Sequence, residues 1–180
     1  MKLTLTAPIK TWDEALPLGN GLQGGLLWGE GGTLRLSLDR GDLWDERPAS
    51  GDPLAGFTYA RMAQLVAAGD NEGIVKVADG AYFYDTPTKI PAGRIEIDLA
   101  EGQELSAFTL DLTTATAQVA LGSDGAVQGV FCATEPVALL LIPGAEPREL
   151  RTIAPKAVRK LGYAELELGR DGTTTWFVQP

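Results

Sequence analysis

Histidine is missing from the 180-residue chain. Its absence excludes Ser-His-Asp and Cys-His catalytic pairs, imidazole metal ligands and an imidazole switch near neutral pH. Acid or base chemistry would therefore fall to carboxylates, lysine or tyrosine. Cysteine occurs once, as Cys132, so no internal disulfide can form. The apolar, strand-like sequence around Cys132 predicts a buried and inert thiol.

Positive charge is scarce, with 15 Lys plus Arg against 24 Asp plus Glu and a net charge of −9. No basic block offsets this balance, so neither a nucleic acid nor an anionic membrane is expected as a partner. Long apolar runs are absent as well, and the first residues lack the apolar segment of a signal peptide. We expect a cytoplasmic protein that needs no cofactor; secretion would require that a leader has been removed.

What the chain does contain is apolar residues spaced by two, the pattern of half-buried strands. Glycine and proline, 22 and 11 residues, punctuate it with turns at intervals of about ten residues. A mainly β fold, an antiparallel β-sandwich, is predicted. The candidate strands lie around residues 3–5, 34–38, 95–97, 108–112, 119–121, 127–131, 139–142, 163–168 and 176–178.

Residues 57–68 break this pattern, because their apolar positions follow helical spacing until Gly69. A second, shorter helix is expected from Asn71 to Ala78. Both would be inserted between early and late strands and pack on the sheet. Because the last strand, 173–180, ends without a turn or a polar tail, we expect residues 1–180 to form a single β-sandwich domain that is incomplete at its C-terminal end.

Gly19 to Gly24 match the pattern G-x-G-x-x-G. A dinucleotide site requires a strand before this pattern and a helix after it. Residues 25–29 have strand character instead. The segment therefore predicts a tight turn that leads into a strand.

A second unusual segment, residues 38–48, concentrates charges around Trp44. An Asp–Arg network that pins the loop and buries Trp44 is one interpretation, and direct contact with a sugar is another, since sugars stack on aromatic rings and bind carboxylates. Metal binding is not expected, because the carboxylates lack the spacing of an EF-hand. The aromatic run from Tyr82 to Tyr84 either packs internally or forms an exposed patch.

Trp12 to Gly25, followed by Leu36 to Trp44, resembles the start of glycoside hydrolase family 95, the α-L-fucosidase-like proteins. The first segment follows that family's W-x-E-A-L-P-x-G-N-G-x-x-G pattern. The second departs from N-E-D-T-L-W-S-G but keeps Asp42, Leu43 and Trp44. Residues 91–99 and 131–136 are similar to a later strand and hairpin approach of the family.

The resemblance implies a supersandwich-like N-terminal domain that packs on a separate (α/α)₆ barrel, where the catalytic acid and base lie. This chain has no such barrel, so no catalytic residue is assigned. The family geometry implies that Asn20, Arg40, Trp44 and Asp45 face the barrel or its substrate.

The sequence is consistent with three functions. The first is a non-catalytic N-terminal domain that scaffolds or docks onto the catalytic barrel of the same parent chain. The second is an independent carbohydrate-binding module that uses Trp44, Tyr82 and Tyr84. The third is a small hydrolase that uses Asp39, Asp42 or Asp45 as its carboxylates.

Overall fold

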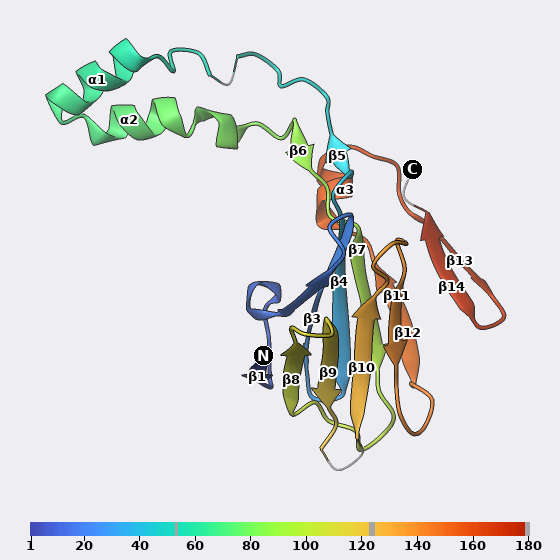
Figure 1. Ribbon diagram of the computed structural model, residues 1–180. Helices are drawn as coiled ribbons and strands as arrows, with labels where there is room; N and C mark the ends of the chain where they lie inside the picture. Colours follow the sequence, from blue (N-terminus) through green and yellow to red (C-terminus); the bar gives the residue numbers. More distant parts are fainter. Residues whose placement is uncertain (53, 123–124, 179–180) are drawn as a thin grey trace. The chain divides into compact units, whose positions relative to one another are not determined.

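Two five-stranded antiparallel sheets form the β-sandwich that the sequence predicts (Figure 1). The computed structural model describes residues 1–52, 54–122 and 125–178. The first sheet has the order β1 (Lys2–Thr6), β8 (Ala107–Asp111), β9 (Thr116–Ala120), β10 (Ala126–Phe131) and β11 (Ala138–Leu141). The second has the order β12 (Glu149–Ile153), β7 (Gly93–Asp98), β4 (Thr33–Arg40), β3 (Gln23–Glu30) and β2 (Leu16–Gly19).

The core lies between these sheets because alternate residues of each strand point to the same side. From the second sheet, Leu27 and Leu34 are fully buried. From the first sheet, Phe108, Val119 and Val127 are fully buried. All five belong to one hydrophobic cluster that both sheets contribute to. Burial of this apolar surface is the main stabilising contribution to the fold.

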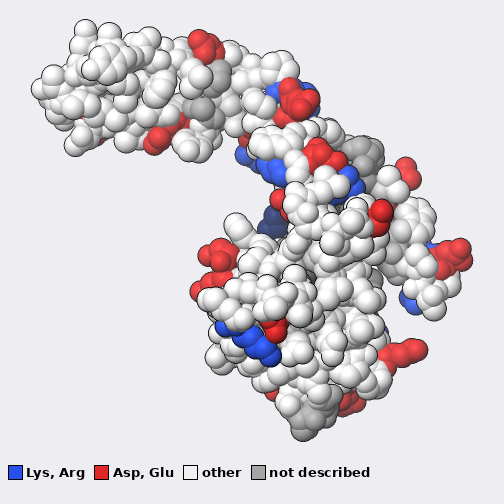
Figure 2. Space-filling view, viewed as in Figure 1, with Lys and Arg blue, Asp and Glu red and all other residues white. Residues whose placement is uncertain are grey.

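The exposed face of the first sheet is mainly polar over β1, β8, β9 and β10, with Lys2 and Asp111 paired at one end. Thr4, Thr109, Gln118 and Gln128 are neighbours across four strands and alternate with the core residues. Figure 2 shows this side of the molecule, over β8, β9 and β10, as mostly free of Lys, Arg, Asp and Glu. The alternation therefore follows the pattern of a sheet with one buried face and one solvated face.

The contacts divide the chain into two compact units. Met1–Leu43 and Ile90–Pro180 form the first unit, which holds the sandwich, and Trp44–Lys89 form the second. We refer to them as the sandwich unit and the helical unit. The packing of the helices on the sheet stays a prediction. The same holds for the prediction that residues 1–180 form a single domain.

The helical unit contains α1 (Tyr59–Ala68) and α2 (Asn71–Ala78), so the expected helices are confirmed. Thr58 caps the start of α1 by accepting a hydrogen bond from the Arg61 N–H, and Gly69 ends the helix in the left-handed region at φ 65°. A short 3₁₀ turn, η2 (Gly80–Phe83), follows α2. A two-stranded ladder of β5 (Trp44–Asp45) and β6 (Thr88–Lys89) joins the two ends of the unit.

Several elements of the sandwich unit differ from the sequence prediction. The strand β12 was not expected, and residues around Tyr163 lie in the turn after a short helix, α3 (Lys156–Lys160), rather than in a strand. The hairpin that follows is formed by β13 (Glu167–Asp171) and β14 (Thr174–Val178). It confirms the strand predicted at 176–178, whereas the strand predicted at 163–168 begins later, at Glu167. A 3₁₀ turn, η1 (Trp12–Glu14), precedes β2. Among the described residues, none of the helices combines the length and hydropathy needed to cross a lipid bilayer.

Cys132 corrects another expectation, because its thiol is exposed and not buried. The strand β10 ends one residue earlier, so Cys132 lies in the turn that leads to β11. The pKa of its thiol is lowered, because the backbone N–H groups of Thr134 and Glu135 and the Thr134 hydroxyl donate hydrogen bonds to the sulfur. Strand alternation alone does not show where a strand stops, which is why the sequence placed this residue inside.

Candidate functional site

Asn20 fixes the turn between β2 and β3 through its side chain. Its Oδ1 accepts hydrogen bonds from the N–H groups of Leu22 and Gln23 at 3.1 and 2.8 Å. Its Nδ2 donates to the carbonyl oxygens of Cys132 and Glu135 at 2.7 and 3.1 Å. The side chain thus forms an Asx-type turn and also ties the second sheet to the β10–β11 connection of the first.

The glycines around Asn20 serve this turn, which confirms the prediction of a tight turn before a strand. Gly19 and Gly24 face each other in the β2–β3 ladder, so the segment connects two antiparallel strands. Gly21 adopts a φ of 92°, which side-chain-bearing residues rarely reach. A dinucleotide fingerprint would require a helix where β3 begins.

Arg40 lies beside this turn at the end of β4. Gln23 pairs with Arg40 across the β3–β4 ladder, and the Gly41 N–H donates to the Leu22 carbonyl at 2.7 Å. The Arg40 guanidinium holds the Asp42 carboxylate at two points, with Nε at 3.0 Å from Oδ1 and Nη2 at 2.7 Å from Oδ2. The pKa of Arg40 is raised, because the hydrogen bonds and charge of Asp42 stabilise its cation.

Trp44 and Asp45 belong to the helical unit, where they form β5. Asp45 is buried, and Arg47 donates to its carboxylate from both Nε and Nη2, at 2.9 and 2.5 Å. The backbone N–H of Arg47 adds a third hydrogen bond, at 3.1 Å. Among the interpretations of residues 38–48, an Asp–Arg network therefore exists, in the pairs Arg40–Asp42 and Asp45–Arg47.

Trp44, however, is 53% exposed, so its expected burial in that network is wrong. Its backbone pairs with Lys89 in the two-stranded ladder of β5 and β6. Tyr82 is 86% exposed and Tyr84 is half-buried. The side chain of Phe83 lies outside the described residues. The exposed aromatic residues of the helical unit thus include Trp44 and Tyr82.

The structure places the four candidate residues in two pairs, one in each unit. Asn20 and Arg40 lie on adjacent turns at one end of the second sheet. Trp44 and Asp45 lie in the helical unit. Within the described part of the chain, no three His, Cys, Asp or Glu side chains are grouped as a metal site.

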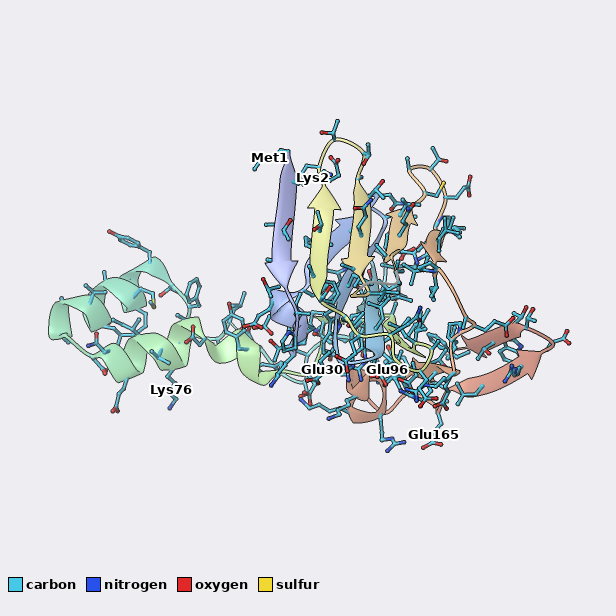
Figure 3. All side chains as sticks on the ribbon, turned by 90° about the horizontal axis from the view of Figure 1, so that it is seen from below. Met1, Lys2, Glu30, Lys76, Glu96 and Glu165 are labelled. Carbon is cyan, nitrogen blue, oxygen red and sulfur yellow. The ribbon has the colours of Figure 1, made fainter. Side chains whose placement is uncertain are left out.

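A charged network that the sequence analysis did not identify covers the outer face of the second sheet. Trp28, Arg35, Glu96 and Arg151 are direct neighbours across β3, β4, β7 and β12. The guanidinium carbons of Arg35 and Arg94 lie 5.0 and 5.4 Å from the Trp28 ring centroid, in cation–π distance. Figure 3 shows Glu96 within this crowded region, whereas Lys76 of α2 points into solvent.

Three arginines converge on Glu96, which is only 13% exposed at its side chain. The nitrogen–oxygen distances are 3.3 Å to Arg35, 2.8 Å to Arg94 and 3.3 Å to Arg151. Arg151 also contacts Asp98 at 2.6 Å. The signal in the sequence was charged residues at period two on β4, β7 and β12, which becomes a network only when the strands pair.

These contacts set the pKa of Glu96. Burial by itself raises it, but the charges and hydrogen bonds of Arg94, Arg151 and Arg35 outweigh burial, and the pKa lies below its ordinary 4.5. The pKa of Asp98 is lowered too, chiefly by hydrogen bonds from Arg151 and Thr33. Both carboxylates therefore stabilise the fold at neutral pH, and this contribution is lost as the pH falls through their folded-state pKa values.

The Glu96→Gln variant tests this network through the pH dependence of stability. We expect wild-type stability to fall on acidification below about pH 5, and the variant to start less stable at neutral pH and to lose less on acidification. Urea unfolding at a series of pH values measures both. Glu101→Gln, in an exposed turn, changes the net charge equally and serves as the control. A variant with the full wild-type acid dependence would contradict the prediction.

The Asn20→Ala variant tests whether Asn20 is a structural tether. Removal of its four hydrogen bonds is expected to lower the unfolding free energy by about 1–2 kcal/mol. The loss is this small because the freed backbone groups form hydrogen bonds with water instead, and these replace most of the lost interaction energy. Urea unfolding measures the loss. Gln128→Thr, which removes an exposed amide from β10, should stay within about 0.5 kcal/mol of wild type. Equal stability of both variants would show that the tether contributes nothing.

Residues 3–143 match the model of the glycosyl hydrolase family 65 N-terminal domain. The chain belongs to this family. No curated protein sequence matches the chain. The prediction of a glycoside hydrolase N-terminal domain is confirmed, while the family named is 65 and the resemblance to family 95 stays a prediction.

Proposed function

We propose that this chain is the non-catalytic N-terminal domain of a glycoside hydrolase of the α-L-fucosidase-like type, and that it docks onto a catalytic barrel of the same parent chain. The family match over residues 3–143 carries the proposal. The site supports it, because the carboxylates of Asp42 and Asp45 are each held by a neighbouring arginine. Such contacts are typical of carboxylates with a structural role. Hydrogen bonds of the Asn20 side chain and of the Gly41 N–H hold the turns of Asn20 and Arg40 at one end of the second sheet, where they can present an edge to another domain.

The proposal has a direct test with the separately produced catalytic domain of the parent protein. The 180-residue chain alone should not hydrolyse 4-nitrophenyl α-L-fucoside or the corresponding glucoside. Mixed with the catalytic domain, it should form a 1:1 complex in sedimentation velocity runs and raise that domain's melting temperature. Turnover that survives repurification of the chain alone would overturn the non-catalytic assignment, and the absence of a complex would overturn docking.

A second candidate function is carbohydrate binding, and the exposure of Trp44 and Tyr82 favours it. Open aromatic faces stack on the apolar C–H faces of sugar rings. Titration with L-fucose and with maltotetraose should then shift tryptophan fluorescence, and Trp44→Ala should remove the shift. Trp12→Ala, which deletes another exposed tryptophan at 63% exposure, is the control and should keep it. A fluorescence signal that does not respond to either sugar would favour the docking function.

A further inference from the structure

A groove beside α3 is a surface that the candidate site does not include. It has a volume of about 700 Å³ and lies between the end of β12, the helix α3 and the start of β13. We call it the α3 groove. Its lining includes apolar side chains and three cations: Val158, Leu166, Leu168, Lys156, Arg159 and Lys160.

Part of the apolar lining of the groove is exposed. Val158 is 4% exposed and anchors α3, while Leu166 is half-buried and Leu168 is 64% exposed. Trp176 and Val178 of the following hairpin do not line the groove, but they are also exposed, at 43% and 50%. An isolated two-stranded hairpin gains little stability by itself, and apolar side chains left open on it mark a contact surface.

The charge of the groove is opposite to that of the protein. Lys156, Arg159 and Lys160 all lie within the five residues of α3, whereas the chain as a whole carries −9. Among the described residues that line the groove, the acidic side chain is Glu165, whose Oε1 lies 3.2 Å from Arg159 Nη2. Both partners of this pair are 85% exposed, so the pair adds little stability and opens easily. Figure 3 shows Glu165 at the outer margin of the molecule.

We propose that the α3 groove is a docking site for a polypeptide segment of the catalytic domain that carries apolar and acidic side chains together. This inference rests on the proposed docking function and names the surface and the chemistry of the partner. Charge complementarity carries it: an acidic segment meets repulsion over a chain of −9 and attraction at α3. A carboxylate of the partner takes the place of Glu165 on Arg159, and its apolar side chains cover Leu166 and Leu168.

The first experiment uses two fluorescein-labelled 14-residue amphipathic peptides with leucine at every third or fourth position. One carries glutamate at its charged positions and the other carries lysine. Fluorescence anisotropy with the full chain at low salt should give at least about tenfold tighter binding of the glutamate peptide. Chemical-shift changes of backbone amides should map to residues 152–168. Equal binding of both peptides, or shifts confined to other residues, would overturn the proposal.

The Lys156→Glu variant locates the interaction. A glutamate suits the first turn of a helix, so the variant should fold. It should weaken binding of the glutamate peptide about five- to tenfold. Lys76→Glu, on the exposed face of α2, changes the net charge by the same amount and should leave binding as in wild type. If both variants weaken binding equally, the effect is one of net charge and the α3 groove is not the site.

The catalytic domain then separates this inference from the proposed function. If it binds wild-type chain and Lys156→Glu equally well, docking holds but does not use the α3 groove, and the inference fails. If binding weakens with Lys156→Glu and not with Lys76→Glu, both hold. If the catalytic domain does not bind the wild-type chain, the proposed function itself fails.

Discussion

Replacing Gly29 with alanine is expected to destabilise the sandwich unit by more than about 3 kcal/mol. A Cβ at this position would lie 2.2 Å from the Thr33 carbonyl oxygen and 2.8 Å from Leu105 Cδ1. The backbone φ of 151° adds strain for any residue with a side chain. The clash with the Thr33 carbonyl cannot relax easily, because Thr33 is held in the β3–β4 ladder.

Gly29 also connects two segments of the sandwich unit. Its N–H and carbonyl exchange hydrogen bonds with Ile9 at 3.2 and 2.9 Å, which joins the segment after β1 to the second sheet. A shift of Gly29 to relieve the clash would therefore disturb the buried side chain of Ile9. A methyl group at position 29 can therefore be accommodated only at the expense of these contacts.

Gly31→Ala is the matched control for this prediction. Gly31 has a positive φ of 54°, but apart from its chain neighbours no atom of the described residues lies within 4 Å of the place that a Cβ would occupy, so backbone strain is what opposes the substitution. Its cost should be about 1 kcal/mol. Thermal or urea unfolding of the two variants compares them directly. Similar losses for Gly29→Ala and Gly31→Ala would show that the contact with Thr33 is not the cause.

The Phe108→Ala variant is expected to lose about 3–5 kcal/mol of unfolding free energy. Phe108 is fully buried at the centre of the hydrophobic cluster that both sheets share. Truncation removes the transfer free energy of the ring and leaves a cavity between two paired sheets, which have little freedom to close it. With a typical total stability of about 5–15 kcal/mol, the variant would be at the limit of folding.

Urea unfolding followed by far-ultraviolet circular dichroism measures this loss. Phe108→Leu keeps most of the apolar volume and should lose less than half as much, which keeps the prediction testable if the alanine variant does not fold. Leu112→Ala, just beyond β8 and 52% exposed, should cost less than about 1 kcal/mol. A Phe108→Leu variant as unstable as Phe108→Ala would indicate that ring shape, not volume, decides the packing.

Local patterns in the sequence determined much of the secondary structure. Alternation at period two located β1, β4 and most strands of the first sheet, because half-buried strands need no more than that pattern. Helical spacing together with Gly69 located α1 and α2, since capping interactions are made by neighbours in sequence. The turn at Gly19 to Gly24 was predicted for the same reason.

What only the tertiary structure decided are features made by residues far apart in sequence. The strand β12 has charged residues at Glu149 and Arg151, and it became a strand by pairing with β7. Gly25 shows no local reason for its glycine; a Cβ there would meet the Phe131 ring of the opposite sheet at 2.8 Å. Each of these depends on how the strands are ordered and how the sheets face each other.

For the candidate site, too, the sequence indicated some features and the tertiary structure decided others. The sequence alone singled out Asn20, Arg40, Trp44 and Asp45, because their residue types and their motif stand out locally. Only the fold showed that Asn20 donates to carbonyls more than 110 residues away, that Asp45 is buried beside Arg47, and that Trp44 is exposed by about half. Partners and exposure are properties of the packed chain, since burial depends on what other segments cover, and periodicity does not contain that information.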